Sequence, residues 1–267
     1  MPESPAAEAA GAAPFPAPIS VQLYSLREEA SADFASVLER LGRVGFLGVE
    51  PAGLHGMAPR EFRRRVEDAG MTVSSSHIAL PIGEAADEIL DLQEEIGSRE
   101  VVVAFLPPDR FGDSDRIFVT ADQLNRAHEN VKARGMRLGY HNHNWEFASR
   151  IDGRTAHERL FEQLHPEIFA ELDVYWAQVG GSDPAAVVAS LGPRARLLHM
   201  KDGPAKDPKA PMTAAGEGAV DLAGVARAAS HARWHIVELD RCGTDMFEAV
   251  ERSYRYLTRE GLSKGRR

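Results

Sequence analysis

Eight short apolar runs alternate with eight longer amphipathic stretches along most of this 267-residue chain. The alternation is typical of βα units, in which each strand of a parallel sheet is followed by a helix that covers the sheet. We expect strands at residues 19–24, 45–50, 72–77, 100–105, 137–141, 168–173, 195–199 and 234–238. We expect helices at residues 32–43, 59–69, 84–96, 114–134, 155–164, 184–191, 222–229 and 245–258.

The number of units decides between two common forms of parallel sheet. Eight strands with eight helices predict a closed (β/α)8 TIM barrel rather than an open, doubly wound sheet. No linker rich in Pro, Gly or Ser interrupts the pattern, so residues 18–267 are predicted to form one domain. Residues 1–17 are rich in Ala and Pro, and we expect them to be a disordered lead-in.

Short polar residues mark the expected helix starts. Ser31 is predicted to cap the first helix, because a hydroxyl at this place can accept a bond from a free backbone N–H group. Asp183 is predicted to cap a later helix, with Pro184 in the first turn, where proline is tolerated.

Charge and cysteine content exclude several classes of protein. The net charge of −9 argues against a nucleic-acid partner, since phosphate binding needs clustered Lys and Arg. The single cysteine, Cys242, cannot form an intramolecular disulfide, which fits a reducing compartment.

No run approaches the roughly 20 apolar residues of a membrane span, and the N-terminus lacks a signal-peptide pattern. A cytoplasmic protein is therefore expected.

Polar residues follow or end most of the expected strands. In a barrel, such residues converge at the C-terminal end of the strands. The candidates are Glu50, His77, His141, His143, Glu146, Asp173, His199, Lys201 and Glu238. Carboxylates brought together cost energy unless a cation offsets them. Asp173, His199 and Glu238 form a mixed oxygen and nitrogen set that suits a divalent metal ion such as Mn, Co, Mg or Zn.

The remaining candidates have both a functional and a structural interpretation. His141 and His143 alternate along one strand and should point the same way, toward a metal or a substrate, although either could be a core histidine. His77 and Lys201 are predicted to bind substrate. In the structural interpretation, His77 caps the third strand and Lys201 extends its ammonium group to solvent. Glu50 is a substrate-binding candidate or a member of an ordinary ion pair.

Several stretches resemble one known family. They are residues 21–27, 45–50, 140–147, 172–176, 199–202, 216–218 and 237–240. On these residues the chain resembles the sugar phosphate isomerase/epimerase family of xylose isomerase-like TIM barrels, from Val21 nearly to its end. The stretch from His141 to Phe147 has the form HNHxxEF. The same group contains ketose 3-epimerases, inosose dehydratases and endonuclease-IV-like proteins.

The resemblance implies a divalent metal held by a Glu on strand five, an Asp on strand six, a His on strand seven and a Glu on strand eight. Asp173, His199 and Glu238 match this pattern. Strand five departs from it, because His141 stands where the epimerases have glutamate. We expect Glu146 to turn back as the carboxylate ligand, which leaves His141 and His143 for substrate. Direct ligation by His141 is the alternative.

The implied activity is metal-dependent isomerisation or epimerisation of a small sugar or keto-sugar through an enediolate. Glu238 is the expected base on one face of the substrate, and His141, His143 or Glu146 acts on the other. A lyase or dehydratase for a keto-inositol or 3-keto-glycoside is the alternative that the HNH run favours. An endonuclease-IV-like phosphodiesterase and a non-catalytic metal or sugar binder are two more. Related barrels often pair, so a homodimer is left open.

Overall fold

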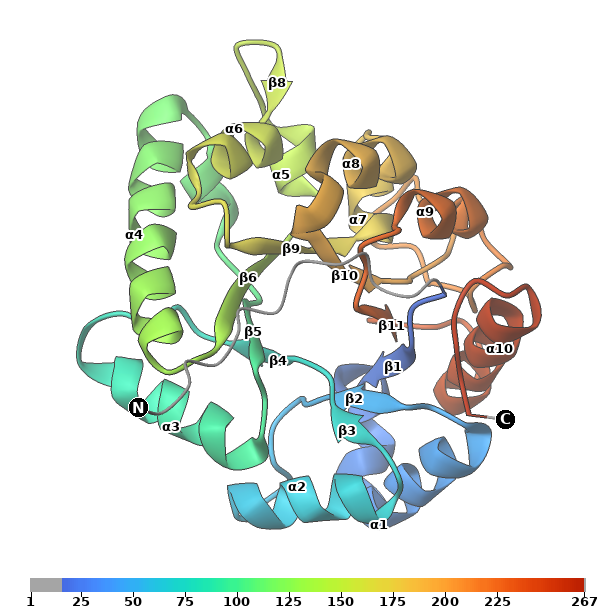
Figure 1. Cartoon of the computed structure of the whole chain (residues 1–267). Helices are drawn as coiled ribbons and strands as arrows, with labels where there is room; N and C mark the ends of the chain where they lie inside the picture. The colour runs from blue at the N-terminus through green and yellow to red at the C-terminus, as the bar shows by residue number, and fades with distance from the viewer. Residues whose placement is uncertain (1–15, 267) are drawn as a thin grey trace, which may run out of the picture.

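A computed structural model of the chain describes residues 16–266 and places nine parallel strands in one sheet. They are β1 (Ile19–Gln22), β2 (Gly48–Glu50), β3 (Thr72–Val73), β4 (Ser76–Ile78), β5 (Glu100–Val103), β6 (Arg137–His141), β9 (Phe169–Asp173), β10 (Ala195–His199) and β11 (Trp234–Val237). Figure 1 shows these strands surrounding the centre of the molecule, with helices outside them.

The two edge strands of the sheet, β3 and β4, follow each other directly in the chain, and this segment closes the barrel. The strand order runs β3-β2-β1-β11-β10-β9-β6-β5-β4. β3 and β4 are the two halves of the third expected strand, interrupted at Ser74 and Ser75. Ser74 donates to the carbonyl of Val49 beside β3, while Ser76 pairs in register with Val101 of β5. The predicted (β/α)8 barrel is therefore confirmed, and the third strand joins its two edges.

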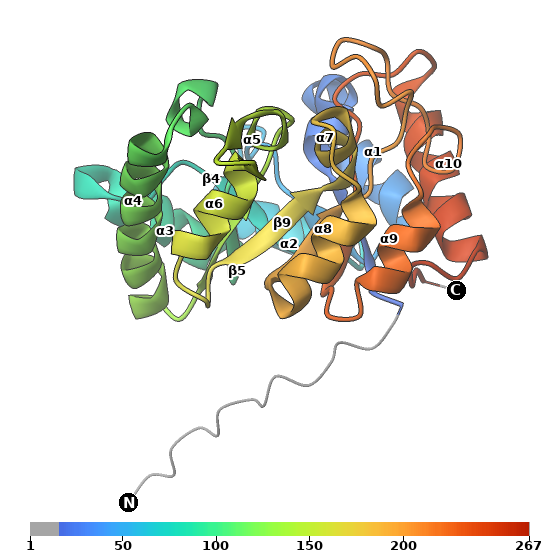
Figure 2. The same ribbon diagram turned by 90° about the horizontal axis from the view of Figure 1, so that it is seen from above.

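Ten α-helices and one hairpin accompany the sheet in the described chain. The helices are α1 (Arg27–Val44), α2 (Pro59–Asp68), α3 (Ala86–Ile96), α4 (Ser114–Ala133), α5 (Trp145–Ala148), α6 (Ala156–Gln163), α7 (Val174–Val179), α8 (Pro184–Leu191), α9 (Leu222–Ala228) and α10 (Met246–Arg259). The hairpin pairs β7 (Arg150–Ile151) with β8 (Arg154–Thr155). The short α5 and α7, which follow β6 and β9, and the hairpin were not expected from the sequence. Figure 2 shows the helices packed around the strands in a second view.

One of the two predicted helix caps is confirmed and the other is wrong. Asp183 accepts a bond from the N–H of Ala185 at 2.9 Å and begins α8. Helix α1 already begins at Arg27, and the hydroxyl of Ser31 donates to the Arg27 carbonyl inside it. Helix α1 is kinked at Asp33, whose φ of −153° is not helical. Its carboxylate accepts from the N–H of Ser36, which offers the backbone a partner outside the helix ladder.

The barrel interior changes from apolar to polar along the strands. Val102, Phe169, Leu197 and Ile236 form a buried apolar cluster. Side chains alternate along a strand, so Phe169 of β9 is followed on the same face by Glu171 and then by Asp173. In the same way Leu197 of β10 is followed by His199. The apolar cluster therefore fills the barrel interior directly below the polar side chains near the strand ends.

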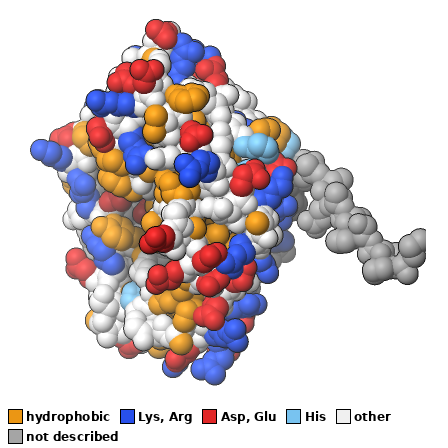
Figure 3. Space-filling view, turned by 90° about the vertical axis from the view of Figure 1, so that its left-hand side faces the viewer, with side chains coloured by type: hydrophobic (Ala, Val, Ile, Leu, Met, Phe, Trp, Pro, Cys, Tyr) orange, Lys and Arg blue, Asp and Glu red, His pale blue; other side chains and the backbone are white. Residues whose placement is uncertain are grey.

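The described residues begin and end beside the barrel, and the surface is mixed in charge. Residues 1–15 of the expected disordered lead-in lie outside the described residues, whereas Ala17 is buried and its carbonyl accepts from the N–H of Lys264. Acidic and basic side chains are interspersed on the face seen in Figure 3, where α3 and α4 lie. Among the described helices, none combines the length and apolar character of a membrane-crossing helix.

Candidate active site

A pocket of about 370 Å³ opens at the C-terminal ends of the strands. Its lining residues come from the ends of several different strands and from the loops that follow them, as barrel sites do. They are Gln22, Tyr24, Pro51, Ala52, Gly53, His77, Ala104, Phe105, His141, His143, Lys201, Glu238 and Asp240. The pocket thus contains most of the side chains that the sequence singled out.

Two other features of the described residues lie away from this pocket. A hollow of about 420 Å³ lies beside the β7–β8 hairpin, and its lining contains no group of potential metal ligands among the described residues. His128, His165 and Glu167 lie together near the start of β9, where Lys132 already pairs with Glu167 at 2.7 Å. Neither feature includes the polar residues at the strand ends, so the pocket is the candidate active site.

A lower layer of buried carboxylates supports the site. Oε2 of Glu171 lies 2.6 Å from Nε2 of His77, 3.1 Å from Nδ1 of His141 and 3.3 Å from Nε2 of His199. Oε2 of Glu50 lies 2.9 Å from the same His199 nitrogen. Gln22 donates its side-chain N–H to this Glu50 oxygen at 2.8 Å. Both carboxylates are fully buried.

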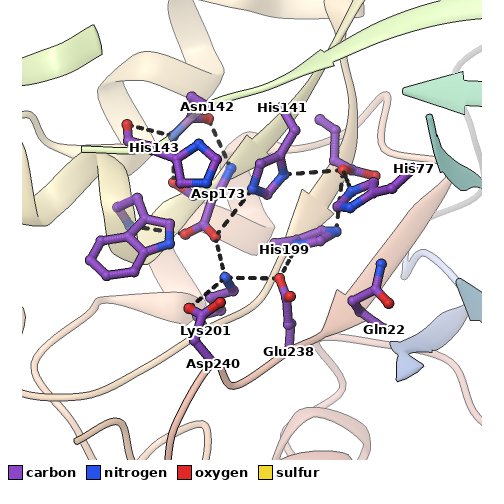
Figure 4. A network of polar contacts seen from close by, with 12 residues as sticks. Gln22, His77, His141, Asn142, His143, Asp173, His199, Lys201, Glu238 and Asp240 are labelled. Carbon is purple, nitrogen blue, oxygen red and sulfur yellow. Dashed lines mark hydrogen bonds and ion pairs between the residues drawn. The ribbon is translucent and has the colours of Figure 1, made fainter. Parts of the chain in front are cut away.

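An upper layer faces the pocket. Nδ1 of His199 lies 2.6 Å from Oε2 of Glu238, and Nε2 of His141 lies 3.8 Å from Oδ2 of Asp173. Two imidazoles therefore link the layers, each with one nitrogen toward a buried glutamate and the other toward a carboxylate of the upper layer. Figure 4 shows this arrangement, with Lys201 between Asp173 and Glu238.

Lys201 is the ammonium of the upper layer. Its Nζ lies 2.8 Å from Oδ2 of Asp173, 2.8 Å from Oε2 of Glu238 and 3.0 Å from Oδ2 of Asp240. The side chain is almost fully buried. Burial alone would lower the pKa of Lys201, but the carboxylates of Asp173, Glu238 and Asp240 raise it well above its ordinary value. Lys201 is therefore charged at neutral pH.

The same contacts set the protonation of the acidic groups. Burial raises the pKa of Asp173 to about 6 against the opposing effect of Lys201. Burial also disfavours the charged form of Glu238, but Lys201 and His199 outweigh it and lower the pKa of Glu238 well below its ordinary value. Glu238 is thus ionised at neutral pH and can accept a proton.

Asp173 is fixed by its neighbours as well as by its strand. Its Oδ1 accepts from the N–H of Trp176 at 2.9 Å, which caps α7 and directs Oδ2 toward Lys201. Asn142 accepts from the N–H of Asp173 at 3.0 Å and donates to its carbonyl at 3.3 Å. The position of this carboxylate therefore depends on hydrogen bonds from two separate segments.

The donor set fits a divalent metal ion. The ligand atoms of Asp173, His199 and Glu238 all lie within 4.8 Å of one another. His141 belongs to a neighbouring group of the same kind with His77, Glu171 and His199, and its Nε2 lies 3.8 Å from Oδ2 of Asp173. Imidazole nitrogens with carboxylate oxygens suit Zn, Mn or Co. Metal-binding imidazoles usually pair their other nitrogen with a carboxylate, which is the role that Glu50 and Glu171 have here.

Glu146, the expected strand-five ligand, is not brought to these groups. Its Oε1 accepts from the hydroxyl of Tyr140 at 2.6 Å, and its Oε2 accepts from the N–H of His143 at 2.9 Å. Among residues 16–266, Glu146 belongs to no cluster of potential metal ligands. Burial raises its pKa to about 7. For the alternative, His141, Nε2 lies 3.8 Å from Oδ2 of Asp173.

The other predicted residues lie at two levels. His77, His143 and Lys201 line the pocket, so a substrate can reach them. Glu50 is fully buried beneath His199 and does not line the pocket. His143 stacks on Trp145 with a ring separation of 4.3 Å, and burial lowers its pKa to about 3, with Lys201 adding to the effect. His143 is therefore neutral at ordinary pH.

Two acidic residues of the network were not assigned a role from the sequence. Glu171 lies two residues before Asp173, and strand alternation alone places both on the inner face. Asp240 lies two residues after Glu238, beyond the end of β11, where alternation is no longer a guide. The first could have been found from the sequence, and the second depends on the path of the loop.

Comparison with known proteins agrees with the barrel fold. Residues 38–259 match the family described as "Xylose isomerase-like TIM barrel". A solved structure of a sugar phosphate isomerase/epimerase from Parabacteroides distasonis is 27% identical with a TM-score of 0.79, and the match covers 98% of this chain and all of the other. No curated protein matches the chain.

Two more distant structures share the fold. One is described as an L-ribulose 3-epimerase, with 16% identity and a TM-score of 0.63, over 92% of this chain and 94% of the other. The second is a probable 3-DHS dehydratase, AsbF, from Bacillus anthracis, with 15% identity and a TM-score of 0.70, over 90% and 98% of the two chains. At these identities the similarity concerns the barrel alone.

Proposed function

This chain belongs to the xylose isomerase-like TIM barrel family, and we propose that it is a divalent-metal-dependent isomerase or epimerase of a small sugar or keto-sugar. The observation that carries the proposal is the two-layered cluster at the strand ends. In it, His141 and His199 are each held by a buried glutamate and face Asp173 and Glu238.

We assign the metal to His141, Asp173, His199 and Glu238. Manganese, cobalt, magnesium and zinc remain the candidate ions. A metal ion at these ligands would polarise the carbonyl of an α-hydroxy carbonyl substrate and stabilise the enediolate. His141 replaces Glu146 in this assignment, because both Glu146 oxygens already accept hydrogen bonds from the strand-five segment.

The protein supplies a proton acceptor on two sides of the pocket. Glu238 follows β11 and is ionised, so its carboxylate can take the proton from the carbon beside the carbonyl. His143 follows β6 and is neutral, and its Nδ1 is buried without a hydrogen-bond partner among the described residues. Delivery of a solvent proton to the opposite face through the neutral His143, with loss of the proton on Glu238 to solvent, would give an epimer, and return of the proton from Glu238 to the neighbouring carbon would give an isomer.

Lys201 and His77 would hold substrate oxygens. His77 lines the pocket while its Nε2 contacts Glu171, and Lys201 reaches the pocket between the upper carboxylates. The lining contains no other Lys or Arg among the described residues. We therefore propose an uncharged carbohydrate as substrate, with no nucleic acid or membrane partner, and a cytoplasmic location consistent with one unpaired cysteine.

Exchange of a substrate proton with deuterium tests this function. The protein is loaded with Mn²⁺ and incubated in D₂O with neutral ketoses, keto-inositols and 3-keto-glycosides, and exchange is followed by NMR. We expect exchange at the carbon beside the carbonyl, its loss in Glu238→Gln, and its retention in Glu217→Gln, a surface residue paired with Arg252. A dehydrated or cleaved product would identify a lyase, and binding without exchange would contradict an enzymatic function.

A further inference from the structure

Lys201 contacts one carboxylate oxygen on each of two residues that we propose as metal ligands. Its Nζ lies 2.8 Å from Oδ2 of Asp173 and 2.8 Å from Oε2 of Glu238. Both residues belong to a group whose ligand atoms lie within 4.8 Å of one another. Two cations so close together repel strongly inside a protein. The ammonium and a divalent ion are therefore alternative occupants of this acidic position.

Asp240 offers the ammonium a third partner. Its Oδ2 is the third carboxylate oxygen near Nζ, at 3.0 Å, and it belongs to no group of potential metal ligands among the described residues. Its side chain is 24% exposed, whereas Asp173 and Glu238 are almost fully buried. Lys201 can thus keep one ion pair at the pocket wall after leaving the other two.

The backbone around Asp240 is held in place. The guanidinium of Arg27 donates to the Asp240 carbonyl at 3.2 Å, and the Asp240 N–H donates to the sulfur of Met212 at 3.3 Å. Because these contacts fix the main chain, the Asp240 carboxylate stays within reach of position 201. Movement of Lys201 between its partners requires only rotation of its own flexible side chain.

We propose that Lys201 is a built-in counter-cation of the metal site, and that Asp240 receives it when a metal ion binds. Lys201 keeps Asp173 and Glu238 compensated before the ion arrives, since uncompensated buried carboxylates are costly. Asp240 is a positioning residue that favours metal entry by giving the displaced ammonium a partner. This inference rests on the proposed metal site but assigns a role to two residues outside its ligand set.

The proposal predicts opposite effects for the two residues. Lys201→Met removes the competing cation, so Mn²⁺ should bind about tenfold more tightly. The metal-free Lys201→Met protein should also unfold at a lower temperature than the wild type. Asp240→Asn leaves the lysine with no partner outside the ligand set, so Mn²⁺ should bind about tenfold more weakly.

A double-mutant cycle separates this exchange from simple loss of a nearby charge. Mn²⁺ affinity is measured by calorimetry for the wild type, Lys201→Met, Asp240→Asn and the double variant at one pH and ionic strength. Circular dichroism confirms that each variant is folded, and Lys201→Gln replaces Lys201→Met if the latter is not folded. We expect the Asp240→Asn effect to shrink to within about twofold when Lys201 is absent, because Asp240 then has no lysine to receive.

Two results would overturn the proposal in different ways. An equal effect of Asp240→Asn in both backgrounds, or no gain in affinity on removing Lys201, would refute the exchange and leave the metal site intact. If neither the wild type nor the Lys201 variants bind Mn²⁺, Zn²⁺ or Co²⁺, the metal site of the proposed function is also wrong.

Discussion

Nε2 of His199 lies 2.9 Å from Oε2 of Glu50, and this contact orients the imidazole so that its other nitrogen faces Glu238. The other nitrogen, Nδ1, lies 2.6 Å from Glu238. Burial lowers the pKa of His199, but Glu171, Glu238 and Glu50 outweigh it and raise that pKa well above its ordinary value. His199, together with the ammonium of Lys201, therefore balances part of the buried negative charge.

Glu50 is expected to control metal affinity without touching the metal. Glu50→Gln removes the charge that orients His199 and keeps the size of the side chain, so Mn²⁺ affinity should fall by roughly 10–100-fold. Calorimetry measures the affinity, with Glu217→Gln as a surface control. Unchanged Mn²⁺ affinity in folded Glu50→Gln would show that the His199–Glu50 contact has no such role.

The strand-five ligand can be decided by two substitutions. His141→Asn should weaken Mn²⁺ binding by about tenfold or more, since it removes a proposed ligand nitrogen. Glu146→Gln should leave the affinity within about threefold of the wild type, because both Glu146 oxygens already bond within the strand-five segment. The reverse order of effects would restore Glu146 as the ligand.

Phe105 is expected to contribute to substrate binding. Its side chain is 56% exposed at the pocket and packs edge-on against His143, with ring centroids 5.4 Å apart. Phe105→Ala should raise the KM of the substrate found by proton exchange several-fold and change kcat less. Phe118→Ala is the matched control, because Phe118 is similarly exposed but lies on α4 outside the pocket lining. Equal KM values for all three proteins would contradict the prediction.

His157 should make the fold sensitive to acid. Its ring stacks between Phe147 and Phe161, at 4.5 Å from each, and burial, with a smaller effect of Arg194, lowers its pKa to about 3. The unfolded chain, with an ordinary histidine pKa of about 6.5, binds the extra proton between these two values. The free energy of unfolding should therefore fall as pH drops below about 6.5, by up to about 1.4 kcal/mol per pH unit from this group.

His157→Phe should remove this contribution while keeping a ring between the two phenylalanines. Urea unfolding at several pH values between 7.5 and 5 measures the slope, and His231→Phe, in the turn before β11, controls for losing a histidine elsewhere. A slope that is the same in the wild type and His157→Phe would show that His157 is protonated without cost in the folded protein.

The sequence predicts the barrel well because each βα unit carries its own pattern. β6 and β10 have the predicted bounds, since their apolar runs end at His141 and His199. The third strand is split at Ser74 and Ser75, which the run of residues 72–77 does not reveal. Tertiary hydrogen bonds, such as that from Ser74 to the Val49 carbonyl, decide this break.

The site is predictable where the strands position it and less so beyond them. Asp173, His199 and Glu238 come together because parallel strands end at one level. Glu146 lies in a short helix after β6, and its distance from those groups depends on its bond with Tyr140. Asp240 likewise depends on a loop. Local periodicity does not determine either path.

Metal content of the purified protein is the most direct test of the central claim. The wild type and the variants Asp173→Asn and His199→Asn are dialysed against Mn²⁺ and Zn²⁺, and bound metal is measured by inductively coupled plasma mass spectrometry. We predict about one divalent ion per chain in the wild type and its loss in both variants. Absence of bound metal in the wild type, or an equal content in all three proteins, would contradict a metal site at these residues.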